Sequence, residues 1–221
     1  MSLPEVVAAL ISDAGTMLDV AGSSAVGSAV AGYLRKRRKI ARDILLEELR
    51  AGAVDPAFVA HEDEVIGVLF HYRRAAEEGA ARVNLRLLAK AIVGEYRNGR
   101  LVADKFMYFA NMLAELSQDE IIVIGTMYKH AHGAASKSSG DEDLHTGAWG
   151  ATWKELVASG MNGKDVLAAA NRALRSGLLI AMSTVSMVSF EVSSLLSEIG
   201  TTIDFQDAIR REQGHMDNKM S

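Results

Sequence analysis

Proline restricts helix formation more than any other residue, and this chain contains only two, Pro4 and Pro56. A proline removes a backbone hydrogen bond, clashes with the preceding helical turn and disfavours the helical conformation of the residue before it. Nearly all of the sequence is therefore free to form helices. Hydrophobic residues make up 49% of the 221 residues, which is enough to build a buried core. We predict a mainly α-helical protein.

Charge is distributed unevenly along the chain, which has a net charge of −4. Residues 35–50 contain seven basic and three acidic side chains, whereas residues 101–221 contain ten basic and fifteen acidic ones. The basic side chains of the first stretch gather in one short run, Arg35, Lys36, Arg37, Arg38, Lys39 and Arg42. These six residues, within 35–42, are candidates for binding a polyanion, either lipid headgroups or nucleic acid.

The apolar pattern divides the chain into a helical region, 1–100, and a second region, 101–221. In the first region we expect a helix to about residue 14, an amphipathic helix from about Leu34 to Arg50 and one long helix from Glu62 to Tyr96. Each has apolar residues at spacings of three and four, as on one face of a helix. The first region is thus predicted to be helical throughout, apart from its turns.

A segment rich in Gly, Ala and Ser, 22–32, precedes the basic run. Gly22, Gly27 and Gly32 are candidates for self-association, because small residues let helices approach closely. Between Asp19 and Arg35 there are 15 uncharged residues, fewer than the ~20 that a membrane-spanning helix needs. A spanning helix is therefore disfavoured. The segment and the adjacent basic run still fit a protein that docks on the surface of the inner membrane.

The second region begins with the clearest helix boundary in the sequence. Ser117 is followed three residues later by Glu120 and then by an apolar run, which is the pattern of a capping box. We expect a helix from about Gln118 to His130, an exposed loop over 133–147, and short helices near 152–159 and 164–176. Trp149 and Trp153, four residues apart, are expected to share a helical face and to mark a contact surface or the seat of the C-terminal module.

The stretch from Leu178 to Leu196 fits two secondary structures. As a helix it places Leu178, Met182 and Val185 on one apolar stripe, and as a strand pair it alternates apolar and small residues in a segment rich in β-branched side chains. Periodicity alone leaves both alternatives open.

The order of these segments resembles a known family. A capped helix from Ser117, a short helix, a further helix ending in the sequence RALRSGLL at 172–179, a β-prone stretch and FEVSSLLSEIG at 190–200 follow one another. This order resembles that of the winged-helix regulators related to the multiple-antibiotic-resistance repressors. The resemblance covers about residues 103–215 and implies a helix-turn-helix followed by a two-stranded wing and a final helix.

The resemblance also implies a recognition helix, for which this sequence offers Lys164, Arg172 and Arg175 as basic candidates. The implied wing, 180–189, lacks basic residues and lacks the Gly, Asn, Asp or Pro that usually form its turn. Since duplex DNA is bound largely through phosphate contacts, nucleic acid is disfavoured as a partner of this acidic half. A module for protein contacts is favoured.

No arrangement of residues in the sequence indicates catalysis. There is no cysteine, no glycine-rich phosphate loop and no Gly-x-Ser-x-Gly elbow. His130, His132 and His145 are weak candidates for metal ligands, and we expect neither a metal nor another cofactor. The sequence therefore predicts a cytoplasmic, non-enzymatic regulatory or interaction protein that binds a protein partner or itself. The alternative is an oligomerising protein at the membrane surface.

Overall fold

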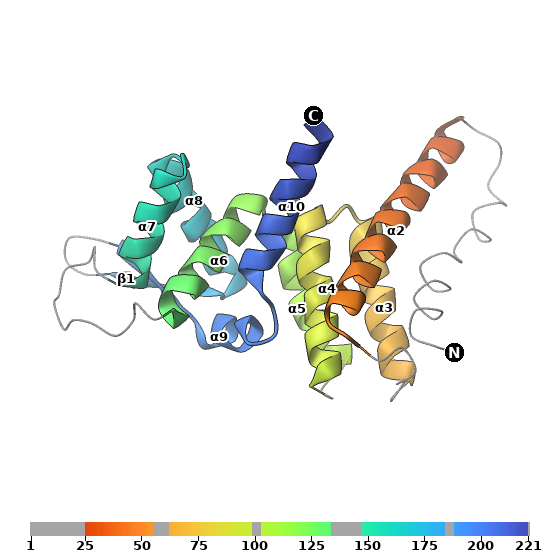
Figure 1. Ribbon diagram of the computed structural model, residues 1–221, viewed down its shortest axis with the longest axis horizontal. Helices are drawn as coiled ribbons and strands as arrows, with labels where there is room; N and C mark the ends of the chain where they lie inside the picture. Colours follow the sequence, from red (N-terminus) through yellow and green to blue (C-terminus); the bar gives the residue numbers. More distant parts are fainter. Residues whose placement is uncertain (1–24, 55–61, 99–102, 134–146, 184–187, 221) are drawn as a thin grey trace. The chain divides into compact units, whose positions relative to one another are not determined.

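The computed structural model describes residues 25–54, 62–98, 103–133, 147–183 and 188–220, and these are mainly helical with one small two-stranded antiparallel sheet (Figure 1). The predicted mainly α-helical fold class is confirmed. The chain divides into two compact units, Met1–Glu115 and Leu116–Ser221. The division falls later than the boundary at residue 100 that the sequence suggested, because α5 (Ala103–Glu115) packs against helices of the first unit.

The first unit consists of α2 (Ala25–Ala51), α3 (Glu62–Glu77), α4 (Arg82–Arg97) and α5. Both α3 and α4 contact the other three helices, and α4 is the more deeply buried of the two. Its burial is nearly continuous from Val83 to Val93. The apolar residues at spacings of three and four that predicted these helices therefore form the core of this unit.

The predicted single helix from Glu62 to Tyr96 is wrong, because the chain breaks into α3 and α4. Gly79 adopts a φ of 103° between them, a left-handed conformation that side chains other than hydrogen strongly disfavour. The backbone N–H of Ala80 donates to the carbonyl of Ala75 across the turn. A glycine in the middle of an apolar pattern thus ends one helix and lets the next pack back against it.

Helix α2 is longer than the helix predicted from Leu34 to Arg50, because it includes residues 25–32 of the segment rich in Gly, Ala and Ser. It ends just before Gly52, where an added β-carbon would overlap the side chain of Val93. Gly22 and the helix predicted up to residue 14 lie outside the described residues. Among the described helices, none is long and apolar enough to cross a membrane.

A buried cluster of charges joins α2 to α4. Glu48 and Arg86 are each 3% exposed, and their side chains approach to 2.5 Å. Lys90 lies 3.2 Å from the other carboxylate oxygen of Glu48, and Glu47 lies 3.1 Å from Arg86. Charges this deeply buried require opposite partners, so the cluster fixes how α2 lies on α4.

The second unit is assembled around α6 (Gln118–His132), which contacts α7 (Ala148–Ala158), α8 (Gly163–Ala173), α9 (Ser194–Gly200) and α10 (Phe205–Met220). The predicted capping box is confirmed: the backbone N–H of Glu120 donates to the Ser117 hydroxyl, and the backbone N–H of Ser117 donates to the Glu120 carboxylate. The two predicted short helices correspond to α7 and α8. The predicted loop over 133–147 lies largely outside the described residues.

The stretch from Leu178 onward forms a hairpin of β1 (Leu179–Ser183) and β2 (Val188–Val192). Leu179 pairs with Val192, and Ala181 pairs with Phe190, so these side chains share one face. Leu179 and Phe190 are buried on that face, which explains the choice of strand over helix. A short 3₁₀ turn, η2 (Leu174–Ser176), and Gly177, with a φ of 71°, separate α8 from β1.

The two tryptophans connect the hairpin to the neighbouring helices. Trp149 meets Phe190 of β2 edge-on with ring centroids 4.7 Å apart, and it also contacts Trp153 at 5.8 Å. Trp153 in turn lies against the start of α8, where an added β-carbon at Gly163 would come within 2.7 Å of the indole. The tryptophan pair thus connects α7, α8 and the hairpin within the second unit.

Candidate functional site

The outer face of α8 carries the recognition-helix candidates of the sequence. Lys164, Leu167, Ala168, Asn171 and Arg175 are all exposed, and spacings of three and four residues place them on one side of α8 and its 3₁₀ extension. We call these five residues the α8 outer face. Its middle is uncharged, and the Asn171 side-chain amide donates to the carbonyl of Leu167 within the helix.

Both arginines among these candidates lie near acidic side chains of the capped helix α6. Arg172 is 3.9 Å from Glu120 and 3.9 Å from Asp119, and Arg175 is 3.8 Å from the other oxygen of Glu120. Glu120 is buried, and its carboxylate also completes the capping box. Its charge therefore offsets part of the positive potential that the two arginines would offer to a phosphate.

The outer face of the hairpin is apolar. Ile180 and Met182 are 48% and 44% exposed, and they lie on the opposite side of the sheet from the buried Phe190. They pair across the strands with Glu191 and Ser189. We call these four residues the hairpin outer face. The sequence of the hairpin, 179–192, contains no lysine or arginine, so nothing on it can neutralise a phosphate.

The basic run lies on α2, where helix geometry divides its residues. Arg37 donates to the carbonyls of Ala76 and Ala80 at the end of α3, and Arg38 is buried and donates to Glu77 at 2.6 Å. These two arginines therefore stabilise the contact of α2 with α3.

The other cations of the run point outward. Arg35, Lys36 and Lys39 are exposed and have no hydrogen bond or ion pair within the described residues. Arg42 is partly exposed and forms an ion pair with Asp43 at 3.2 Å. Three of the six predicted polyanion-binding residues thus remain available to a partner.

The self-association candidates are only partly described. Gly27 and Gly32 lie on α2, whereas Gly22 is outside the described residues. A β-carbon added at Gly32 would meet nothing within 4 Å, so no described segment approaches it closely. Self-association through these glycines stays a prediction.

Two of the candidate metal ligands, His130 and His132, contact side chains that do not form a metal site. His130 lies 2.8 Å from Glu155, which also accepts hydrogen bonds from Lys129. The Lys129 ammonium lowers the pKa of Glu155, and His130 contributes in the same direction, while burial opposes both. His132 stacks on Tyr128 with centroids 4.3 Å apart. His145 lies outside the described residues. Among the described residues, no group of three or more acidic or histidine side chains could hold a metal ion.

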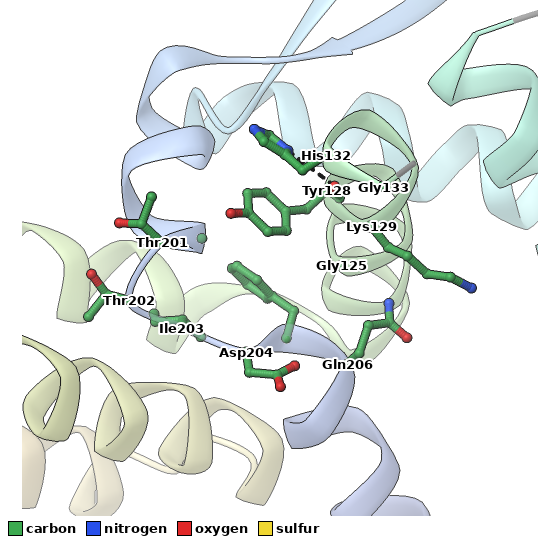
Figure 2. Close-up of a pocket in the computed structure, with 12 residues that line it drawn as sticks. Gly125, Tyr128, Lys129, His132, Gly133, Thr201, Thr202, Ile203, Asp204 and Gln206 are labelled. Atoms are coloured by element: carbon green, nitrogen blue, oxygen red, sulfur yellow. Dashed lines mark hydrogen bonds between the residues drawn. The ribbon is translucent and has the colours of Figure 1, made fainter. Parts of the chain in front are cut away.

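A cleft of about 420 Å³ lies between the end of α6, the α9–α10 loop and the start of α10 (Figure 2). Tyr128 forms its wall together with Phe205, at 6.2 Å between ring centroids, and burial raises the pKa of the Tyr128 hydroxyl. The ring fits only because residue 200 is glycine, since a β-carbon there would overlap it. Gln206 also lines the cleft, and its side-chain amide nitrogen is buried without a hydrogen-bond partner among the described residues.

No local sequence motif marks this cleft, because its walls come from segments about seventy residues apart. No protein-family model, curated protein or solved structure matches the chain.

Proposed function

We propose that the second unit is a winged-helix-like module that binds a protein partner through the α8 outer face and the hairpin outer face. Through this contact the protein acts as a non-enzymatic regulatory or adaptor protein. The order α6, α7, α8, hairpin is the order that the resemblance to winged-helix regulators implied, and this order supports the proposal. A fold does not determine a function. The kind of partner is therefore inferred from the chemistry of the α8 outer face and the hairpin outer face.

The single observation that carries the proposal is the hairpin outer face, where Ile180 and Met182 are nearly half exposed and no cation accompanies them. A wing that binds duplex DNA contacts phosphates, and each phosphate contact is made by a donor or a basic side chain. Apolar side chains at the same place gain free energy instead when a protein surface covers them. The chemistry of this hairpin therefore favours a protein partner with an apolar patch.

The α8 outer face supports the same conclusion. Leu167 and Ala168 lie in its middle, and of the three basic candidates two lie within 4 Å of Glu120. Proteins that bind duplex DNA commonly make several phosphate contacts, and the acidic side chains on α6 weaken those available here. A partner with an uncharged surface needs no such contacts.

The first test separates DNA from protein. Gel-shift titrations with mixed-sequence duplex DNA at low salt are expected to show weak retention that is the same for the wild type, for Arg172→Glu/Arg175→Glu and for the matched exposed control Arg210→Glu. A loss of retention confined to the double variant would show that α8 binds DNA, and the proposal would be wrong.

The second test measures the protein contact itself. A photo-crosslinking amino acid at the position of Leu167 or Met182 is expected to give the same discrete adduct in the cells that make the protein, whereas the exposed position of Gln213 on α10 gives none. Ile180→Asp should reduce the adduct formed from position 167 about ten-fold, because an apolar side chain of this size contributes about 1.5 kcal/mol when covered. Equal adducts at all three positions, or no effect of Ile180→Asp, would contradict the proposal.

A further inference from the structure

Helix α2 is 27 residues long, whereas α3 and α4, on which it packs, have 16 residues each. The turn between α3 and α4 lies level with Arg37, whose guanidinium donates to the carbonyls of Ala76 and Ala80. The part of α2 before Arg37 therefore continues past these two helices. In Figure 1 the first turns of α2 extend away from α3 and α4.

The side of α2 that packs on α3 and α4 stays apolar along this extension. At about 100° per residue, Val30 and Tyr33 lie on the same side of the helix as the buried Ile44. They are nevertheless 48% and 51% exposed, and Leu34 beside them is partly exposed. The three exposed cations of the basic run lie on the opposite side of α2. We call Val30, Tyr33 and Leu34 the uncovered stripe of α2.

The 24 residues before α2 lie outside the described residues, and they join the helix at the end that carries the uncovered stripe. Apolar residues recur in their sequence at spacings of three and four, which in a helical register places them on one side. These residues are Leu3, Val7, Leu10, Ala14 and Leu18. The three acidic residues of the same segment fall outside this apolar side. The chain thus supplies a second apolar stripe next to the uncovered one.

Length and charge both favour contact between this segment and α2. Residues 19–24 include Gly and Ser, which are typical of a turn, and about six residues suffice to connect two antiparallel helices. A segment that turns back there brings Ala14 level with Val30, and Leu10 level with Leu34. The segment contains three carboxylates and no lysine or arginine, whereas residues 35–39 of α2 are all basic. A second copy of α2 would instead bring the same basic run to this place.

We propose that the uncovered stripe of α2 is the docking site of residues 3–18 of the same chain, which lie antiparallel to α2 and cover Val30, Tyr33 and Leu34. Removal of these apolar side chains from water drives the contact. A segment joined through a short connection has an effective concentration of about 1 mM or more, so it covers the stripe ahead of a separate molecule. This docking belongs to the first unit and is independent of the protein contact proposed for the second unit.

Disulfide trapping in the full chain tests the proposal, because the chain contains no cysteine of its own. In Ala14→Cys/Val30→Cys, oxidised glutathione is expected to produce a disulfide within one molecule, detected by mass and by gel mobility without reductant. The matched control is Ala14→Cys/Gly32→Cys, because Gly32 lies on the opposite side of α2 and an added β-carbon there meets nothing within 4 Å. Since a disulfide requires β-carbons about 4 Å apart, it should form at least about ten-fold more slowly in the control.

Proteolysis provides a second measurement that needs no cysteine. Thermolysin cleaves before apolar residues such as Leu10, and a docked segment is cut only while it is transiently released. Val30→Asp/Tyr33→Asp is expected to raise the rate of cleavage within residues 3–18 about ten-fold, because charged side chains replace the apolar contacts. Lys39→Gln, on the opposite side of α2, is the control and should leave this rate within about two-fold of the wild type. Circular dichroism checks that all variants fold.

Three results would overturn the proposal. One is a disulfide in Ala14→Cys/Val30→Cys that joins two chains, because a second copy would then cover the stripe. Another is disulfide formation at the same rate in this variant and in Ala14→Cys/Gly32→Cys. The third is a rate of cleavage within residues 3–18 that Val30→Asp/Tyr33→Asp leaves unchanged, because the segment would then not depend on the uncovered stripe.

Discussion

Replacing Glu48 by leucine should destabilise the first unit, because it leaves a buried guanidinium without its nearest counter-charge. Arg86 is 3% exposed and lies 2.5 Å from Glu48, while Glu47, which also contacts Arg86, has a side chain that is 51% exposed. Leucine is apolar and has one side-chain heavy atom fewer than glutamate. The substitution therefore fills most of the space between α2 and α4 and removes the electrostatic compensation.

The expected loss is about 3–5 kcal/mol in the free energy of unfolding, the usual result of breaking a buried ion pair from one side. Arg86→Met should cost less, because Glu48 keeps Lys90 at 3.2 Å. In the double variant Glu48→Leu/Arg86→Met the buried pair is absent, but Lys90, whose side chain is 13% exposed, still loses its contact with Glu48. We therefore expect this variant to be less stable than the wild type and more stable than Glu48→Leu. The exposed neighbour Glu47→Leu is the matched control and should change stability by less than about 1 kcal/mol.

Urea denaturation measures these effects separately in the two units. Both tryptophans, Trp149 and Trp153, lie in the second unit, so their fluorescence reports on that unit, whereas circular dichroism at 222 nm follows the helices of both. We expect Glu48→Leu to lower the midpoint seen by circular dichroism. The fluorescence transition provides the internal comparison, because none of the substituted side chains belongs to the second unit.

A double-mutant cycle over these variants measures the energetic coupling between Glu48 and Arg86. If Glu48→Leu cost less than about 1 kcal/mol, the guanidinium would have found other compensation, and the cluster would not fix α2 on α4. If the double variant lost the sum of the two single effects, the two side chains would not be coupled, and the ion pair would have no role in stability.

Three further outcomes are expected in the second unit. Gly200→Ala should destabilise it by about 1–3 kcal/mol, measured by tryptophan fluorescence in urea, because the added methyl group overlaps the Tyr128 ring. Ser117→Ala should cost about 1 kcal/mol in the same assay, because it removes the hydroxyl half of the capping box. The Lys129 ammonium keeps the pKa of Glu155 below its usual value of 4.5, so this carboxylate stabilises the folded state at neutral pH. The difference in unfolding free energy between the wild type and Glu155→Gln should therefore shrink as the pH falls from about 6 to about 3.

Each of these three predictions would be contradicted by a specific result. Gly214→Ala on α10 is the control for Gly200→Ala, because an added β-carbon there meets nothing within 4 Å and should stabilise the helix by up to about 1 kcal/mol. An equal loss in both variants would show that the Tyr128 ring is not the cause. Unchanged stability of Ser117→Ala would remove the capping box as a contributor, and a difference for Glu155→Gln that grows on acidification would reverse the assigned sign.

The helices were largely predictable because their signals are local. The capping box at Ser117 and Glu120 marked the start of α6 correctly, and the two short helices expected on either side of Gly160 and Gly163 correspond to α7 and α8. Apolar spacing failed across Gly79, because a helix that continues and a helix that turns back on itself bury the same apolar stripe. Only the left-handed conformation of this one residue distinguishes them.

The surfaces were less predictable than the helices. The basic run is evident in the sequence, where its six residues are equivalent. In the structure, Arg37 and Arg38 pack against the end of α3 and are not available to a partner. The cleft beside Tyr128 and Gln206 was missed entirely, because its walls come from α6 and from the junction of α9 and α10. Exposure and concavity depend on which segments pack against a residue. The spacing of residues along one segment does not contain this information.

By itself the sequence determined that the chain is mainly helical, since scarce proline and regular apolar spacing act within a few residues of each position. The stretch from Leu178 to Leu196 remained undecided at that level, because its local preferences for helix and strand are nearly balanced. Tertiary structure decided it. Phe190 is buried against Trp149 only if the stretch folds as a hairpin, and contacts between distant segments outweigh local preference wherever that preference is weak.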